Sequence, residues 1–276
     1  MRQEAYFCTV KELDKLGKDN IPRQLISHTH LIYSSPATLA FNSPGAEGFG
    51  VKRAGLAVPD SVMLIVSPGC CGRNTSVLSS MRAYQDRFYY LLMDETDIVT
   101  GRHLKKIPKA VAEICEGLKK KPSVVMICIT CVDALLGTDM ERVCHKAEEY
   151  AGVPVRPCYM YALTREGRKP PMVHVRQSVY SLLEPKKKKG NVVNLLGYFS
   201  PLTDDCELYD LLHGAGVKTI HEISRCKDYA QYQTMSEANF NLVLHPEARF
   251  AAEDFHDRLK IPYIELRRLY PVSYTH

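Results

Sequence analysis

Apolar and polar positions in the first half of the chain follow two alternating patterns. Residues 61–68 and 123–130 form continuous apolar runs, and the third run at residues 153–160 is more mixed. Apolar runs of this length are typical of strands buried on both faces of a parallel sheet. Between the runs, apolar residues recur every three or four positions, which predicts helices over residues 76–94, 103–121 and 139–152. Strands that alternate with helices predict a doubly wound α/β domain.

A charged segment, EPKKKKGN at residues 184–191, interrupts this pattern. Because it combines a lysine run with Pro and Gly, we interpret it as a solvated linker between two domains. The expected N-terminal α/β domain is 1–188, and the expected second, smaller α/β domain is 189–276. Within the second domain the pattern predicts strands at residues 192–199, 217–223, 240–246 and 262–266, separated by helices at residues 205–216, 229–238 and 248–260.

Composition narrows the classes of protein that fit. The 276 residues are 45% hydrophobic and 24% charged, which is ordinary for a globular protein. The net charge of +5 is small and its Lys and Arg residues are scattered, so nucleic-acid binding is not indicated. The N-terminus has no signal-peptide core, and no segment reaches the roughly 18 uninterrupted apolar residues of a membrane span. We therefore expect a cytoplasmic protein with no membrane contact.

The chain contains ten cysteines. A reducing compartment keeps thiols free, so a cysteine cluster there is more often catalytic or metal-binding than disulfide-bonded. Cys115, Cys144 and Cys206 lie in helical patterns, and we interpret them as core residues because cysteine is among the most buried residue types.

Four other cysteines stand at the ends of the two apolar runs. Ligands of open α/β sheets bind beyond the carboxyl ends of the strands, where the loops of neighbouring strands converge. If these two strands are close neighbours, their terminal thiolates reach a common object. Thiolates are the usual ligands of iron–sulfur clusters, and glycines let the backbone approach the sulfide closely. The candidate ligands and backbone positions are Cys70, Cys71, Cys128, Cys131, Gly69 and Gly72.

Three other interpretations of these cysteines stay open. A zinc site normally uses paired C-x-x-C knuckles, which the adjacent Cys70 and Cys71 suit poorly. A dithiol redox pair normally opens a helix, whereas Cys128 lies inside the strand-like run. Simple core packing is the third.

Four ordered stretches resemble the nitrogenase component 1 superfamily, which includes the nitrogenase molybdenum–iron protein subunits, the protochlorophyllide and chlorophyllide reductases, and cofactor-assembly scaffolds. The first is GAEGFGVKRAGLAVPDSVMLIVSPGCCGRNT, which resembles the first cluster-binding region of that family. The others are DETDIVTGRHLKKIPKAV, VVMICITCVDALLGTDM and NFNLVLHPEARFAAEDFHDRLKIPYIELRRLYPVSYT. None of the four stretches is specific to the family by itself, but their occurrence in the same order over most of the chain is specific to it.

The resemblance implies two Rossmann-like lobes, a 4Fe–4S or related iron–sulfur cluster, a paired component 1-type subunit and an ATP-dependent iron–sulfur reductase as partners. By motif position, it assigns Cys71 and Cys131 as cluster ligands. Cys70 stands where the family usually has Gly, and Cys128 lies within the strand, so the resemblance makes both of them replacement ligands rather than inherited ones. No catalytic residue is implied.

The sequence departs from the family pattern in three places. The usual first cysteine, before GAEGFG, is missing, so Asn42, Ser43, a neighbouring thiolate or a partner chain would complete the site, or the cluster is smaller. His245 falls near the cysteine that binds the active-site cofactor in the catalytic subunit, and we interpret it as a hydrogen-bonded loop residue. The chain also stops where the family's third domain would begin.

We therefore expect an oxidoreductase subunit that accepts electrons from the reductase and passes them to an unidentified substrate. Two alternatives remain. An assembly scaffold would hold a metallocofactor precursor without turnover, and a non-metal protein of the same fold would bind a small molecule between its lobes.

Overall fold

The computed structural model describes residues 10–17, 20, 44–69, 79, 84–130, 132–133, 136–160 and 169–266. The chain divides into two compact units, Met1–Ser43 and Pro44–His276. Within the described part of the first unit there is one helix, α1 (Val10–Leu16), whose end is closed by Asn20 donating a side-chain hydrogen bond to the Leu16 carbonyl at 3.0 Å. The second unit carries both sheets.

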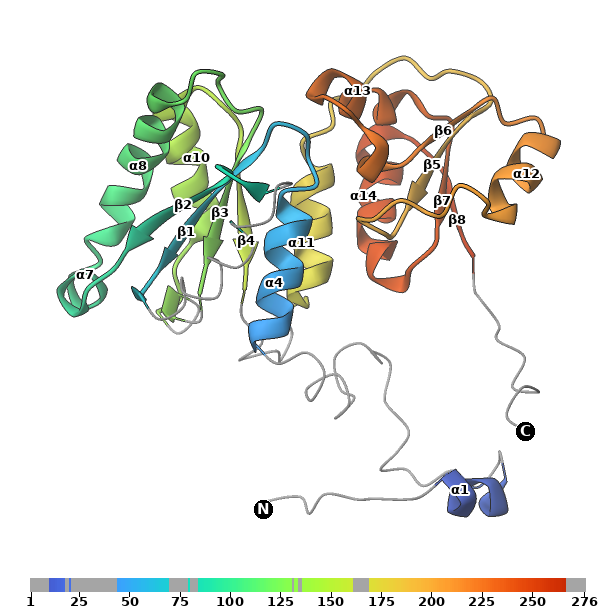
Figure 1. Ribbon diagram of the computed structural model, residues 1–276, viewed down its shortest axis with the longest axis horizontal. Coiled ribbons are helices and arrows are strands. Elements are labelled where there is room, and N and C mark those ends of the chain that lie inside the picture. Colours follow the sequence, from blue (N-terminus) through green and yellow to red (C-terminus); the bar gives the residue numbers. More distant parts are fainter. Residues whose placement is uncertain are drawn as a thin grey trace. The chain divides into compact units, whose positions relative to one another are not determined.

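The first sheet has four parallel strands in the order β2-β1-β3-β4 (Figure 1). Their bounds are β1 (Val62–Ser67), β2 (Phe88–Leu92), β3 (Val125–Ile129) and β4 (Val155–Tyr159). Every residue of β1 and β3 is buried, as their continuous apolar runs predict.

Helices cover both faces of this sheet (Figure 1). On one face, α8 (His103–Gly117) and α10 (Met140–Ala151) pack on Val62, Leu64 and Val66 of β1. On the other face, α4 (Pro44–Gly55) and α11 (Pro171–Tyr180) pack on Met63 and Ile65. The alternation of β1 residues between the two cores follows from the two-residue period of a strand.

The structure contradicts the prediction of a helix over residues 76–94. Its last part, Phe88–Leu92, is the edge strand β2, which pairs in parallel with β1. The burial along β2 alternates, so a half-exposed edge strand produced the apolar spacing that we interpreted as helical. Asp86, with φ of 58°, turns the chain just before the strand begins.

The second sheet repeats the topology of the first, with parallel strands in the order β6-β5-β7-β8. Its strands are β5 (Val192–Leu196), β6 (Thr219–His221), β7 (Phe240–Val243) and β8 (Tyr263–Glu265). The helical segments are α12 (Glu207–Gly214), η4 (Ile223–Arg225), α13 (Tyr229–Gln233), η5 (Thr234–Glu237), η6 (Pro246–Ala248) and α14 (Arg249–Leu259). Two α/β lobes with parallel sheets are therefore present, and the expected fold class is confirmed.

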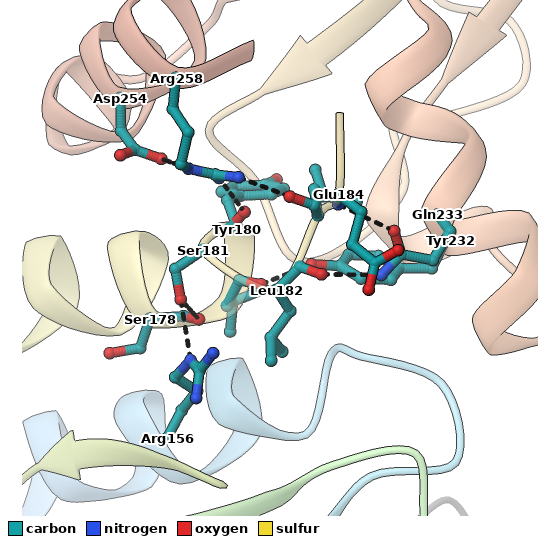
Figure 2. Close-up of polar contacts among 12 residues, drawn as sticks. Arg156, Ser178, Tyr180, Ser181, Leu182, Glu184, Tyr232, Gln233, Asp254 and Arg258 are labelled. Carbon is teal, nitrogen blue, oxygen red and sulfur yellow. Dashed lines mark hydrogen bonds and ion pairs between the residues drawn. The ribbon is translucent and has the colours of Figure 1, made fainter. Parts of the chain in front are cut away.

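The segment between α11 and β5 has no regular structure, yet second-lobe side chains hold its main chain (Figure 2). The amide of Gln233 bridges it, donating to the Leu182 carbonyl at 2.8 Å and accepting from the Glu184 N–H at 3.1 Å. Arg258 donates to the Tyr180 carbonyl at 3.0 Å and also contacts Asp254. The domain boundary expected between residues 188 and 189 lies within this segment and stays a prediction.

A short helix after β2, α7 (Glu95–Thr100), is closed at both ends by the residues that flank it. Asp94 caps it by accepting from the Asp97 N–H at 2.6 Å, and Gly101 ends it in the left-handed conformation with φ of 66°. Over the described ranges, the structure contains no helix with the length and apolar composition needed to span a bilayer.

Candidate functional site

The carboxyl edge of the first sheet is the place to which the sequence assigns the cysteines. β1 and β3 are direct neighbours, with Ile65 opposite Cys128 and Val66 opposite Ile129. The chain leaves β1 toward β2 on one side, whereas β3 lies on the other side, so the β1–β3 edge is the topological switch point of this sheet. Ligands of open parallel sheets bind at such a point.

Most of the expected site residues lie just beyond the part of the chain that the structure describes. Gly69 is described, two residues after the end of β1, but Cys70, Cys71, Gly72 and Cys131 fall outside the described residues. The condition on which the shared site rested, that residues 61–68 and 123–130 form close strands, is met by the pairing of β1 with β3.

Cys128 lies inside β3, not at its end. Cys128 is fully buried in the core between the first sheet and the layer formed by α4 and α11, and it lies opposite Cys158 of β4. Burial, with a smaller contribution from neighbouring Cys128, raises the pKa of the Cys158 thiol well above its usual value. Cys128 therefore lies in the core and not at the end of the strand, and its assignment as a replacement ligand stays a prediction.

Two hydroxyl groups at this edge have no hydrogen-bond partner among the described residues. They are Ser67 Oγ at the end of β1 and Thr130 Oγ1 directly after β3, and the two residues are 0% and 1% exposed. A buried polar group left without a partner costs about 1–3 kcal/mol. Both hydroxyls can donate a hydrogen bond, so this edge fits a sulfur-rich group, whose sulfur atoms act as acceptors.

A buried His–Asp pair joins the start of α8 to the segment that follows β3. His103 at the start of α8 contacts Asp133 Oδ1 through Nε2 at 2.9 Å and the Asp97 carbonyl through Nδ1 at 3.0 Å. Each contact joins a ring nitrogen to an oxygen, so each needs one proton between its two atoms. Thr138 donates to the same Asp133 oxygen at 3.1 Å, while Oδ2 has no partner among the described residues. This pair fixes the segment that follows Cys131 to the start of α8.

A cavity of about 350 Å³ opens between the ends of β3 and β4. Its walls include Asp133, Tyr159, Lys169 and His174. The ring of Tyr159 packs edge-on against the ring of His174 at 4.3 Å between centroids. Burial, and then the charge of Lys169, lowers the pKa of His174 to about 4, so its imidazole is neutral at pH 7.

The carboxyl edge of the second sheet is filled by the protein's own groups. Arg176 of α11 donates two hydrogen bonds to the Gly197 carbonyl, at 3.2 and 2.7 Å, and pairs with Glu247 at 2.8 Å. His245 accepts from the Glu247 N–H through Nδ1 at 3.3 Å, and burial lowers the pKa of its imidazole. The expected hydrogen-bonded loop histidine is therefore observed.

Sequence reasoning did not identify several of these groups. His103 and Asp133 are 30 residues apart, and no local pattern joins them. A polar residue within an apolar run, such as Asp133 or Thr130, is the one signal that the sequence offered. In the described parts of the chain, no group of three or more His, Cys, Asp or Glu residues is arranged to hold a metal ion.

The geometry defines a class: a two-lobed α/β protein in which the two strands that precede the cysteine-bearing segments pair at the switch point of the first sheet. The model of the nitrogenase component 1 type oxidoreductase family matches residues 47–276, and the chain belongs to that family. The expected family is confirmed.

Curated relatives carry a more specific name. The chain is 26% identical over 217 residues to the nitrogenase iron-molybdenum cofactor biosynthesis protein NifE of Nostoc sp., covering 75% of this chain and 44% of that protein. The protein of the same name from Rhizobium meliloti is 27% identical, with 78% and 47% coverage. The chain thus spans about half the length of these relatives.

A solved structure supports the fold alone. The nitrogenase Cp1 structure at pH 6.5 superposes with a TM-score of 0.60 over 82% of this chain and 54% of that one, at 18% identity.

Proposed function

We propose that this chain is an iron–sulfur-binding subunit of nitrogenase component 1 type, with Cys71 and Cys131 as thiolate ligands. The observation that carries the proposal is the direct pairing of β1 with β3, because it brings the starts of both cysteine-bearing segments to the switch point. Gly69 and Gly72 leave room for the backbone at the cluster, and Cys70 is a replacement ligand. The cluster is of 4Fe–4S or related type.

In this proposal the cluster accepts electrons from an ATP-dependent reductase and passes them to a substrate. A paired component 1-type subunit supplies the ligands that two cysteines alone cannot, since such clusters usually take four thiolates. The cytoplasm, as a reducing compartment, keeps the thiols available for iron.

A second candidate function is metallocofactor assembly without turnover. The names of the curated relatives favour it, because they describe cofactor biosynthesis and not catalysis. Assembly and electron transfer share the same cluster-binding edge, so the two candidates differ in what leaves the site: a metal centre or an electron.

Anaerobic purification, with and without a co-expressed partner subunit, followed by iron and acid-labile sulfide assays, tests the proposal. We expect bound iron and sulfide in the wild-type chain and their loss in Cys71→Ala and in Cys131→Ala. Cys206→Ala is the matched control, because Cys206 directly precedes α12 in the second lobe and its replacement should leave the iron content unchanged. Equal iron content in all four proteins would contradict the ligand assignment.

Colourless wild-type protein without iron in every preparation would instead favour the non-metal alternative. The two metal-dependent functions are separated by incubating the loaded protein with labelled iron and a recipient apoprotein. Transfer of label without substrate turnover supports assembly, whereas reductase-dependent electron uptake without transfer supports the oxidoreductase.

A further inference from the structure

The unpartnered hydroxyls of Ser67 and Thr130 lie on the same face of the first sheet. Residues of β1 and β3 alternate between two cores, and Met63, Ile65, Met126 and Cys128 belong to the one beneath α4 and α11. Continuing that alternation by two residues along each strand assigns Ser67 and Thr130 to this face. The pairing of Val66 with Ile129, extended by one step, places the two residues side by side.

The surroundings offer these hydroxyls no partner on the sheet. The next residues inward on the same face are Ile65 and Cys128, which are buried in the core and paired with each other in register. The main-chain carbonyl of Ser67 already accepts from the Met93 N–H at 3.1 Å. Neither hydroxyl bonds to the other, since both lack a partner among the described residues.

Outward from the two hydroxyls, the chain enters both cysteine-bearing segments. Thr130 directly precedes Cys131, and Ser67 stands four residues before Cys71. A hydroxyl group is both a donor and an acceptor, whereas thiolate and sulfide sulfur atoms act as acceptors. A sulfur acceptor at this edge would satisfy both buried donors at once.

We propose that the Ser67 and Thr130 hydroxyls donate hydrogen bonds to sulfur atoms of the cluster or of its thiolate ligands, and thereby raise its reduction potential. The inference rests on the proposed function, and it adds two tuning residues that touch the cluster without ligating iron. A hydrogen bond to sulfur stabilises the more negatively charged, reduced state, so its removal lowers the potential.

The test uses Thr130→Val and Ser67→Ala, which remove the hydroxyl with little change of side-chain shape, and the double variant. Each protein is loaded anaerobically, its iron is assayed, and its midpoint potential is measured by a redox titration followed by electron paramagnetic resonance. We expect a more negative potential in each single variant and a larger shift in the double variant. Thr130→Ser and Ser67→Thr, which retain the hydroxyl, should keep the wild-type potential.

Ser236→Ala is the matched control. Its buried hydroxyl has a protein partner, donating to the Gln233 carbonyl at 2.9 Å in the second lobe, so the potential should not move. An unchanged potential in Thr130→Val and Ser67→Ala, with iron retained, overturns the inference and leaves the proposed function standing.

Loss of iron has its own meaning in this series. If Thr130→Val and Ser67→Ala lose iron while Thr130→Ser and Ser67→Thr keep it, the hydroxyls are required and the inference is supported. If both sets lose iron, side-chain shape decides and the inference is wrong. Absence of iron from the wild-type chain refutes the proposed function itself.

Discussion

The two sheets have the same strand topology, but their carboxyl edges are completed differently. At the first edge, Ser67 and Thr130 present buried hydroxyls without partners among the described residues. At the second edge, the guanidinium of Arg176 occupies the equivalent place, bonding to Gly197 and pairing with Glu247. The same fold therefore leaves buried hydroxyls without described partners at one edge, whereas a side chain from α11 completes the other edge as a structural joint.

The second sheet also contains unmatched polar atoms, but in the middle of its strands. Asn194 donates to Asn241 Oδ1 at 2.7 Å and to the Met235 carbonyl at 2.9 Å, leaving Asn194 Oδ1 and Asn241 Nδ2 without a partner among the described residues. These two amides face each other in register between β5 and β7. Because they lie within the sheet and not at its carboxyl edge, we interpret them as groups that specify the pairing of β5 with β7, and not as a ligand site.

The largest expected effect comes from removing the group that fills the second edge. Arg176→Ala breaks the bonds to Gly197 and leaves Glu247 partly buried without its cation, so we expect a loss of about 3–5 kcal/mol in the free energy of unfolding. Urea denaturation measures it. Arg249→Ala is the control, since its pairing with Glu265 is part-exposed and should be worth at most about 1 kcal/mol. Similar losses in both variants would show that Arg176 is not a structural joint.

The next effect concerns pH and the cavity beside the first edge. The pKa of His174 is lowered to about 4 in the folded protein, so the unfolded chain binds a proton first as the pH falls below about 6.5. The neutral imidazole therefore makes its full contribution to the free energy of unfolding above that pH. As the pH falls toward 4, up to about 3 kcal/mol of that free energy is lost.

We expect His174→Phe, which keeps an aromatic ring against Tyr159, to flatten the decline in unfolding free energy between pH 6.5 and 4. Urea denaturation at several pH values checks it. His145→Phe changes an exposed histidine and should preserve the wild-type slope. An unchanged slope in His174→Phe would show that His174 is not buried as a neutral group.

A smaller effect is expected at Gly197, where the main chain after β5 packs closely against the main chain after β7. Its φ of 142° suits glycine, and a Cβ there would lie 2.8 Å from the main-chain nitrogen of His245. Gly197→Ala should therefore cost about 1–3 kcal/mol, measured as a fall in melting temperature. Gly214→Ala, at a helix end with nothing within 4 Å of the new carbon, should be neutral or stabilising. Equal effects would contradict the close approach of β5 and β7.

The sequence predicted helices well where they have a single apolar face, and poorly where they do not. α10 and α14 have a single apolar face and were expected close to their observed bounds. α11 was not expected, because it packs on α4 and β4 of one lobe and on α14 of the other. A helix buried on several sides has no amphipathic period. In α4, glycines at 45, 48 and 50 lower helix propensity, and the pattern did not reveal the helix.

The candidate site was predictable only in part for a similar reason. Apolar runs located the strand ends, but strand order decides which ends meet, and order depends on contacts between distant segments. The hydroxyls of Ser67 and Thr130 carry little local signal, since the sequence shows only a polar residue within or at the end of an apolar run. Their role follows from burial and from the absence of partners among the described residues.

The smallest expected effect tests the first edge without any metal. In the metal-free chain, Thr130→Val removes a buried hydroxyl that has no partner among the described residues, so the free energy of unfolding should stay constant or rise by up to about 1 kcal/mol. Thr138→Val, at the same edge, removes a hydroxyl that donates to Asp133 and should lower that free energy by about 1–2 kcal/mol. Chemical denaturation of both variants in parallel measures the difference. If Thr130→Val is as destabilising as Thr138→Val, the Thr130 hydroxyl has a protein partner, and the contrast between an open first edge and a filled second edge fails.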